Sequence, residues 1–261
     1  MINRRKQEGV RKMLKEERHQ KIVDLLNIEQ KVIASDLSQR FNVSEDTIRR
    51  DLKELDGQGL LKRVHSGALR VGPPITDFNY RETVASERKK ELAQKALPFL
   101  KEDSVIIIDG STTNLALAKE IPQDFRATII TNSPPIAIEL AQHSNIEIIN
   151  IGGVFYKQSM INIGVQAYKQ LRNIRADLYI MGIYNLDIDA GTSVPTTQES
   201  EIKREMIRIS TEVLGMITND KFGTISNHIV GPVDDLTYLI SEEIPDKVRK
   251  EYNKQKIVLI D

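Results

Sequence analysis

The sequence predicts an α/β protein with a small, mainly helical N-terminal domain followed by a larger domain built on a mostly parallel sheet. Apolar residues recur every three or four positions through residues 15–55, which is the spacing of amphipathic helices. Gly72-Pro73-Pro74 then interrupts regular structure and marks a domain boundary. Beyond it, continuous apolar β-branched runs alternate with helical stretches, the pattern of a parallel sheet covered on both faces.

The composition is that of a soluble globular protein. The 261 residues are 40% hydrophobic and 28% charged, and this length allows one small and one medium domain. No apolar run approaches the roughly 20 residues of a membrane span, and the N-terminus lacks the apolar core of a signal peptide. Cysteine is absent and the four histidines lack metal-ligand spacing, which excludes disulfides and makes a zinc site unexpected. We therefore expect a cytoplasmic protein without a metal or cofactor.

Three helices and a hairpin are predicted in the N-terminal domain. The first two helices span Lys15 to Asn27 and Ser35 to Phe41. The third begins after Ser44, a favourable N-cap, and ends at Gly57-Gln58-Gly59. Leu60 to Val71 follows as a short basic hairpin. This order of elements describes a winged helix-turn-helix, which places its third helix in the major groove of DNA.

The third helix presents a polar outer face. Its apolar residues Ile48, Leu52 and Leu55 recur at spacings of four and three, so they share one face. The opposite face carries arginine, lysine and a threonine hydroxyl, groups that bind guanine, base edges and phosphates. The residues predicted to contact DNA there and in the hairpin are Ser44, Glu45, Asp46, Thr47, Arg49, Arg50, Lys53, Lys62, Arg63 and His65. A three-helix module that binds protein, with its charges merely solvated, is the alternative.

The charge distribution favours a polyanionic partner for the N-terminal domain. Residues 1–71 carry 16 Lys+Arg against 11 Asp+Glu, a net charge of +5, and the remainder carries 21 against 26, a net charge of −5. A solvated surface without a charged partner is the alternative explanation of so modest an asymmetry.

Strand and helix patterns alternate through the C-terminal domain. The predicted strands are Ser104 to Ile108, Ala127 to Thr131, Ile146 to Ile151, Leu178 to Met181, Val213 to Ile217 and Tyr238 to Ile240. The predicted helices are Glu87 to Leu100, Asn114 to Glu120, Ile136 to His143, Val165 to Leu171 and Gln198 to Ser210. In such sheets ligands bind at the carboxyl ends of the strands, where loops lead into helices.

One block of sequence resembles a known family closely. Val43-Ser44-Glu45-Asp46-Thr47-Ile48-Arg49-Arg50-Asp51-Leu52, followed by His65-Ser66-Gly67-Ala68, resembles the DeoR family of bacterial transcription regulators. The family usually has glycine where this chain has Ser66. The resemblance places the helix-turn-helix proper at about Val32 to Asp51. It extends along nearly the whole second domain, which resembles the family's sensor domain and is similar in fold to ribose-5-phosphate isomerase.

Four segments are expected from the resemblance and the breaks in pattern. They are a basic N-terminal extension (1–14), a DeoR-type winged helix-turn-helix (15–71), a linker (72–84) and a sugar-phosphate sensor domain (85–261). Two interpretations of residues 1–12 stay open: a basic arm that reaches along DNA, or a translation start at Met13. We favour the second, because codons for Gln7-Glu8-Gly9 can spell a ribosome-binding sequence upstream of Met13.

The segment Asp109-Gly110-Ser111-Thr112-Thr113 has the chemistry of a phosphate cradle. Its small residues let backbone N–H groups approach an anion, its hydroxyls donate, and a helix start favours negative charge. It is not a Walker loop, because no Gly-Lys-Ser/Thr follows, and an ordinary loop with a helix cap is the alternative. With similar turns after later strands and two lysines to counter phosphate, the predicted site is Asp109, Gly110, Ser111, Thr112, Thr113, Thr131, Asn132, Ser133, Gly152, Gly153, Gly164, Glu199, Lys203 and Lys221.

The resemblance also bears on the helix that carries Glu199 and Lys203. Their spacing alone fits a simple i,i+4 salt bridge, whereas the family pattern places Glu199 to Met206 at the ligand site. Two loops depart from that pattern. Gly182-Ile183-Tyr184-Asn185 is bulkier than the family's small-residue loop, and Thr218-Asn219-Asp220 replaces Asp-x-Ser before Lys221. The pocket is therefore expected to be reshaped.

The resemblance implies a DNA-binding transcriptional regulator, a repressor of a carbohydrate-utilisation operon controlled by a phosphorylated sugar. Its expected partners are double-stranded operator DNA, the effector and further copies of itself in a homodimer or higher homo-oligomer, with no membrane. The alternative is a sugar-phosphate isomerase-like enzyme with an appended DNA-binding module. In that enzyme Glu199 or Asp109 would be the base, and Lys203 would polarise the carbonyl.

Overall fold

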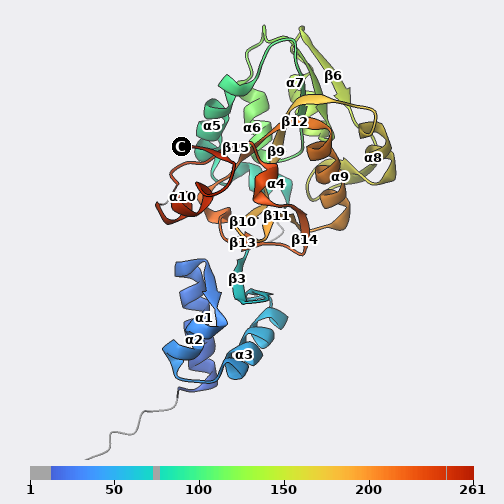
Figure 1. Ribbon diagram of the computed structural model, residues 1–261. Helices are drawn as coiled ribbons and strands as arrows, with labels where there is room; N and C mark the ends of the chain where they lie inside the picture. The colour runs from blue at the N-terminus through green and yellow to red at the C-terminus, as the bar shows by residue number, and fades with distance from the viewer. Residues whose placement is uncertain (1–12, 73–76, 245) are drawn as a thin grey trace, which may run out of the picture. The chain divides into compact units, whose positions relative to one another are not determined.

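The computed structural model describes residues 13–72, 77–244 and 246–261 (Figure 1). The chain divides into two compact units, with the boundary between Val71 and Gly72. The basic arm considered for residues 1–12 lies outside the described residues. Within the described ranges, no helix has both the length and the apolar character needed to cross a membrane.

The first unit is a winged helix-turn-helix. Its elements are α1 (Lys15–Glu29), β1 (Lys31–Ile33), α2 (Ala34–Phe41), α3 (Glu45–Gly57), β2 (Lys62–Val64) and β3 (Gly67–Val71). The three predicted helices and the hairpin of β2 and β3 are confirmed. Strand β1 was not predicted, because three residues are too few to show an alternating pattern. It pairs antiparallel with β3, with Val32 opposite Ala68.

The apolar face of α3 forms the centre of the first unit's core. Ile48, Leu52 and Leu55 are each at most 1% exposed and pack with Ile22 of α1 and Leu37 of α2. Burial of each such side chain contributes about 1.5–3 kcal/mol, so these contacts fix how α3 is rotated. The opposite face is consequently turned to solvent.

Local chemistry defines both ends of α3. The Ser44 hydroxyl accepts a hydrogen bond from the Thr47 backbone N–H at 3.2 Å, which confirms the predicted N-cap. Past the other end, Gly59 has a φ of +71°, a conformation that glycine adopts without strain. There the Leu60 N–H donates to the Leu55 carbonyl at 3.0 Å, so the helix stops where predicted.

A buried carboxylate joins α3 to α1. Asp51 is 2% exposed and accepts from Arg18 Nε at 2.5 Å and Nη2 at 3.0 Å. His19 Nε2 lies 2.9 Å from Asp51 Oδ1, the oxygen that also accepts from Arg18 Nη2. Burial opposes ionisation of Asp51, but the hydrogen bonds from Arg18 and His19 outweigh it and lower the pKa of this carboxyl. The recognition helix is therefore held by ionic contacts as well as by its apolar face.

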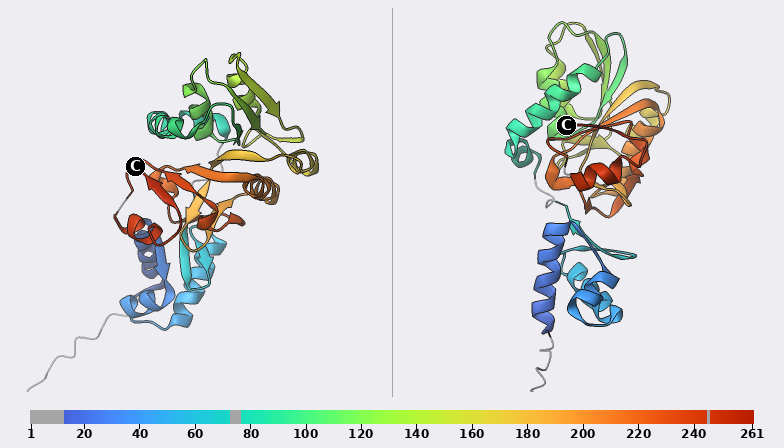
Figure 2. Two further views of the ribbon diagram at one scale, coloured as in Figure 1. Left: turned by 45° about the horizontal axis from the view of Figure 1, so that its top comes forward. Right: turned by 60° about the vertical axis from the view of Figure 1, so that its left-hand side comes forward.

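The second unit is built on a parallel sheet, which confirms the predicted fold class (Figures 1 and 2). Its seven strands, in order across the sheet, are β16 (Val258–Ile260), β15 (Tyr238–Ile240), β12 (Ser210–Met216), β9 (Ala176–Gly182), β4 (Val105–Ile108), β5 (Ala127–Thr131) and β6 (Ile146–Asn150). Every neighbouring pair is parallel. All six predicted strands are present, and β16 is added at one edge.

The strand order reverses direction between β4 and β9. From β4 the chain proceeds to β5 and β6 on one side, whereas from β9 it proceeds to β12, β15 and β16 on the other. The loops that leave β4 and β9 therefore diverge to opposite faces and open a crevice at the carboxyl end of the sheet. This switch point positions the cavity described below.

Helices cover both faces of the sheet (Figures 1 and 2). The helices of the second unit are α4 (Phe78–Thr83), α5 (Ser86–Ala96), α6 (Thr112–Glu120), α7 (Pro134–Leu140), α8 (Val165–Leu171), α9 (Thr197–Arg208) and α10 (Asp246–Tyr252), with the 3-10 turns η1 (Leu97–Phe99), η2 (Asn219–Lys221) and η3 (Val233–Asp235). Alternate residues of β4 face the two layers. Ile106 and Ile108 pack on the side of α5, α6 and α7, and Ile107 packs on the side of α8 and α9.

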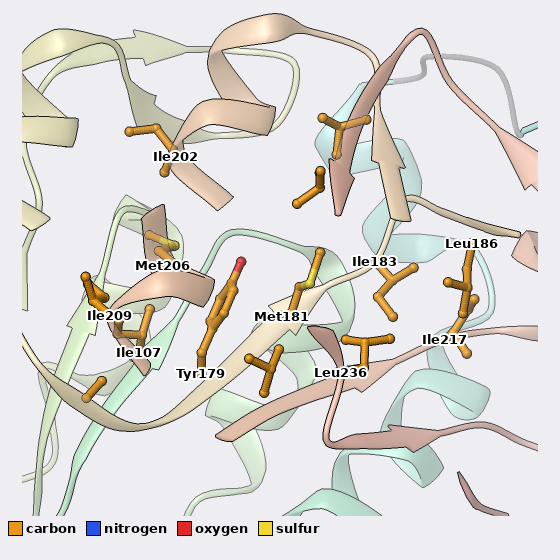
Figure 3. Close-up of a cluster of buried hydrophobic side chains, with 14 of the residues drawn as sticks. Ile107, Tyr179, Met181, Ile183, Leu186, Ile202, Met206, Ile209, Ile217 and Leu236 are labelled. Atoms are coloured by element: carbon orange, nitrogen blue, oxygen red, sulfur yellow. The ribbon is translucent and has the colours of Figure 1, made fainter. Parts of the chain in front are cut away.

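Figure 3 shows the cluster on the α8 and α9 side. Tyr179 and Met181 of β9 pack there against Ile202 and Met206 of α9, and all four are at most 2% exposed. The apolar stripe of α9 therefore faces the sheet.

Short antiparallel elements complete the second unit. They are the hairpin of β7 (Val154–Tyr156) and β8 (Ile161–Ile163), the sheet of β10 (Asn185–Asp187), β11 (Gly191–Val194) and β14 (His228–Gly231), and the two-residue strand β13 (Thr224–Ile225). Helix α4 lies in the segment that we expected to be a linker. Its Phe78 is 2% exposed and packs in the core of the second unit.

Candidate nucleic-acid interface and ligand cavity

The outer face of α3 carries the predicted DNA contacts. Asp46, Arg49, Arg50 and Lys53 are exposed, and Thr47 is half-buried. This is the orientation expected from the apolar spacing, because the buried residues occupy the opposite face. The arrangement leaves two guanidinium groups and an ammonium group free to reach a groove or a phosphate.

The wing adds cations beside α3. Arg63 and His65 are exposed, and together with Arg49 they line a hollow of about 380 Å³ between α3 and the wing. Gly67 fits there because a Cβ would lie 1.9 Å from the Val32 carbonyl oxygen, so only glycine lets β1 and β3 approach. Lys62 Nζ lies 3.7 Å from Asp56 Oδ1. This ion pair leaves Lys62 less available for a contact to DNA than Arg63 and His65.

The remaining predicted contacts lie at the start of α3. Ser44 Oγ and Thr47 Oγ1 are 2.9 Å apart, so the two hydroxyls form one polar pair. Glu45 accepts from Arg49 Nη2 at 3.3 Å on the exposed surface. That pair is worth little in water and is easily exchanged for a contact to DNA.

A cavity of about 270 Å³ lies at the carboxyl end of the sheet, at the switch point. The loops after β4, β9 and β12, the start of α9 and the α4–α5 segment all contribute to its wall. The lining residues are Tyr80, Arg81, Val84, Ala85, Arg88, Lys89, Gly110, Ser111, Thr112, Ser159, Gly182, Ile183, Tyr184, Val194, Glu199, Lys203, Thr218, Asp220 and Lys221.

Asp109 lies behind the cavity wall as a fully bonded carboxylate. It is 2% exposed, and its Oδ1 accepts from the Gly182 N–H at 2.7 Å and from Asn114 Nδ2 at 2.9 Å. Its Oδ2 accepts from the Tyr179 hydroxyl at 2.5 Å and from Lys203 Nζ. Burial and this carboxylate raise the pKa of Tyr179, so the phenol stays protonated as a donor.

Close approach of two loops explains the glycine after β9. A Cβ on Gly182 would lie 2.6 Å from Ser111 Cβ and 2.9 Å from Asp109 Oδ1. Glycine therefore allows the loop after β9 to pack directly on the loop after β4. This contact brings Ser111 and the start of α6 to the cavity.

Cationic side chains dominate the charged part of the wall. Lys89 is 7% exposed and donates to the Val84 carbonyl at 2.6 Å and to the Arg81 carbonyl. Lys221 is half-buried and donates to the Ile183 carbonyl at 2.8 Å. Burial, together with the positive charge of Arg81, lowers the pKa of each lysine to about 8, although Asp220 partly offsets this. The cavity thus concentrates positive charge away from water.

Glu199 gives the wall an acceptor among these donors. It is 5% exposed, lies in the first turn of α9 and accepts from the Thr196 hydroxyl at 3.2 Å. Lys203 lies one turn further along and donates to the Gly182 carbonyl at 2.8 Å and to Asp109. These hydrogen bonds join Lys203 to the loop after β4 and the end of β9 instead of to Glu199, so the helix spacing alone did not identify the contact.

The structure brings together part of the predicted ligand site. Gly110, Ser111, Thr112, Glu199, Lys203 and Lys221 line the cavity. Asn132 does not line the cavity but supports its wall, because its Oδ1 accepts from the Gly110 N–H at 3.3 Å. The predicted residues outside this lining are Asp109, Thr113, Thr131, Asn132, Ser133, Gly152, Gly153 and Gly164.

The α4–α5 segment supplies cavity residues that sequence reasoning missed. Tyr80, Arg81, Arg88 and Lys89 belong to it. The segment shows no strand-end turn and carries no small-residue loop, so nothing in its pattern indicated a ligand. Lys89 lies in a helix whose sequence is typical of a surface helix, so its burial can be recognised only from the tertiary structure.

Family models match both units of the chain. Residues 18–72 match the DeoR-like helix-turn-helix domain, and residues 84–243 match the DeoR C terminal sensor domain. The chain belongs to the DeoR family of transcriptional regulators.

Two relatives agree with this assignment. The chain is 33% identical to the HTH-type transcriptional regulator GolR of Listeria innocua, covering 92% of this chain and 94% of GolR. It is 30% identical to the L-fucose operon activator of Escherichia coli, covering 88% and 96%. Ribose 5 phosphate isomerase A from Neisseria gonorrhoeae is similar with a TM-score of 0.40 and 14% identity, covering 54% of this chain and 56% of the enzyme. This DeoR-family chain is therefore a DNA-binding transcriptional regulator with a sensor domain.

Proposed function

We propose that this regulator represses a carbohydrate-utilisation operon in the cytoplasm and that a phosphorylated sugar, bound in the cavity of the sensor domain, changes its affinity for operator DNA. The observation that carries the proposal is the set of cationic side chains that line the switch-point cavity. Lys89 and Lys221 both have a pKa lowered to about 8 by burial and by nearby positive charge. A phosphate group would offset that repulsion, because an opposite charge restores the favoured ionised state of each lysine.

The rest of the wall suits the sugar part of such an effector. Glu199 offers carboxylate oxygens as acceptors for sugar hydroxyls, and Ser111 and Thr112 lie at the start of α6, where backbone N–H groups favour an anion. Ile183 and Val194 supply apolar surface for the carbon skeleton. One end of the cavity wall therefore favours an anion, while hydroxyl acceptors and apolar contacts complete a site for a small polar molecule.

We call the first unit the DNA reader. In it, we propose that Thr47, Arg49, Arg50 and Lys53 contact bases and phosphates, while the basic side chains of the wing contact the DNA backbone. One reader covers a short site, so we further propose that the protein binds a two-part operator as a homodimer or higher homo-oligomer. Different effector affinity in the DNA-competent and DNA-incompetent states would then couple the two sites.

Catalysis is the weaker alternative. An isomerase needs a carboxylate that is available to remove a proton, whereas Asp109 already accepts four hydrogen bonds. Lys203 is held by the same carboxylate and by the Gly182 carbonyl, so it is not aimed at a substrate carbonyl. Of the two carboxylates considered as the base, Glu199 alone stays available, and one carboxylate without a paired electrophile does not favour isomerisation.

Two measurements test the proposal. Fluorescence anisotropy should show that the full chain binds DNA from upstream of its own gene more tightly than a shuffled duplex, with affinity that falls as salt rises. Thermal unfolding and calorimetry should show binding of glucose 6-phosphate, ribose 5-phosphate or another sugar phosphate, and none of the matching free sugars. Equal binding to shuffled DNA would contradict the reader assignment, and indifference to every phosphate would contradict the effector assignment.

The sign of regulation needs a separate assay in cells. A reporter driven by the same upstream DNA should rise when the gene for this regulator is deleted, if it represses. A fall in reporter signal would instead make it an activator, leaving the DNA and effector sites as proposed.

A further inference from the structure

Arg81 lines the cavity and is held in place by two aromatic rings and a backbone carbonyl. Its guanidinium carbon lies 5.8 Å from the centre of the Phe78 ring and 5.9 Å from the centre of the Tyr184 ring. Its Nη2 donates to the Gln158 carbonyl at 2.9 Å. Two aromatic rings and one hydrogen bond thus hold a planar cation at the cavity wall.

One donor of this fixed guanidinium is unused. Arg81 Nε is buried and has no hydrogen-bond partner among the described residues. Leaving a buried charged donor unmet is costly, so such an atom in a native fold calls for an explanation. Lys89, whose side chain returns to the Arg81 carbonyl, and Glu199 both line the same cavity.

We propose that Arg81 is an effector-binding residue and that its guanidinium takes a phosphate oxygen of the sugar phosphate, with Tyr184 as its positioning residue. This inference rests on the proposed function of the cavity. A guanidinium presents a rigid fork that matches the oxygens of phosphate, whereas the lysines act as point charges. The bulky Tyr184, which departs from the small-residue family pattern, thereby acquires a role: its ring supports the guanidinium that reads the anion.

The position of Arg81 in the chain gives this contact a second consequence. Arg81 belongs to α4, whose N-cap is Asp77, and only residues 72–76 separate that cap from Val71 at the end of β3. A ligand that engages Arg81 therefore binds the helix of the sensor that follows the reader in sequence. The effector contact and the connection to the DNA-binding unit belong to one short segment.

The test uses the full chain and inorganic phosphate, together with glucose 6-phosphate and ribose 5-phosphate, in a buffer without phosphate. Arg81→Gln should weaken anion binding at least about tenfold, because it removes a charge-assisted hydrogen bond. Arg81→Lys should recover only part of the loss, since the fork geometry is absent. Tyr184→Ala should weaken binding about threefold to tenfold, whereas Tyr184→Phe keeps the ring and should keep most of the affinity.

Controls separate binding from folding. Arg126→Gln removes an exposed guanidinium that pairs with Asp103 outside the cavity, and it should bind the anions like the unaltered protein. A purely structural role of Arg81 would lower the unfolding temperature of Arg81→Gln without changing its dissociation constant. If Arg81→Gln fails to fold, the unfolding temperature and the anion dissociation constant of Arg81→Lys are compared with those of the unaltered protein instead.

Each outcome is informative. Anion binding by the unaltered chain that is weakened in Arg81→Gln and in Tyr184→Ala supports the inference. Unchanged affinity in the Arg81 variants overturns it and leaves the proposed cavity function standing. If the unaltered chain binds neither these three anions nor any other sugar phosphate of a wider panel, both the inference and the proposed effector class are overturned.

Discussion

Lys203 Nζ and the carboxylate of Asp109 form an ion pair across the core of the sensor domain, with the two residues 5% and 2% exposed. The pair joins α9 to the loop after β4, two elements separated by 94 positions in sequence. It also supports the cavity from behind, because Lys203 reaches the wall while Asp109 holds the Gly182 N–H.

We predict that Lys203→Met destabilises the sensor domain and abolishes its effector response. Removing the ammonium leaves Asp109 charged and buried, at a cost of about 3–5 kcal/mol. The double variant Asp109→Asn with Lys203→Met should regain part of that stability, because no unpaired charge remains. Urea unfolding of the unaltered protein, Lys203→Met and the double variant checks this. A Lys203→Met variant as stable as the unaltered protein would contradict the prediction. Operator binding should persist, since the reader has a core of its own.

In the reader, Arg49→Ala and Arg50→Ala should each weaken operator binding by about 1–3 kcal/mol if the side chain reads a base. Both arginines are exposed, so neither change should alter unfolding of the protein. Anisotropy titrations with operator and shuffled DNA measure the effect, with Arg126→Ala as a matched surface control. Retention of full affinity by both variants would remove α3 from the interface.

The Asp51 contact makes the stability of the reader depend on acid. The folded pKa of Asp51 is lowered, so its contribution is present above the unfolded value of about 4 and is lost as pH falls below it. Unfolding of the unaltered protein's first unit should therefore become easier as pH falls from about 4 toward the lowered folded pKa. In Asp51→Asn this part of the pH dependence should disappear. If Asp51→Asn unfolds with the same pH dependence as the unaltered protein, other carboxyl groups dominate the loss of stability in acid.

Effector binding should be accompanied by uptake of protons near pH 8. Lys89 and Lys221 have a pKa of about 8 in the empty cavity, and a bound phosphate raises it. Affinity should consequently be highest below pH 8 and fall as pH rises through 8 and above. Titration calorimetry between about pH 7 and 9.5, where a phosphate monoester is already a dianion, isolates this effect. Affinity for the sugar phosphate that rises with pH over this range would contradict the role of the two lysines. In Lys221→Met the affinity should fall less steeply with pH than in the unaltered protein.

Local patterns predicted most of the fold because each element satisfies a local rule. Ser44 caps α3, Gly59 allows the chain to leave it, and the β-branched runs form the buried strands. Strand order is a different matter, because it depends on how the helices pack. β9 lies beside β4 although β5 and β6 intervene in sequence, so loops after β4 and β9 share the cavity.

Strand order and side-chain packing also explain why some predicted site residues do not line the cavity. Gly152 and Gly153 follow β6, the edge strand, two strands away from β4. Asp109 turns back into the core because Lys203, Tyr179 and Asn114 all reach it there. The α4–α5 cations remained unpredicted because their role arises from burial, and burial of a lysine is a property of the tertiary fold.

The central claim is that the sensor cavity and the DNA reader are energetically coupled. Anisotropy titration of the full chain with its upstream DNA, with and without a saturating sugar phosphate that it binds, measures this coupling most directly. We predict a change in operator affinity of about 5–150-fold, the range typical of coupled sites, and the loss of that change in Arg81→Gln. Identical DNA affinity with and without a bound sugar phosphate would contradict the account.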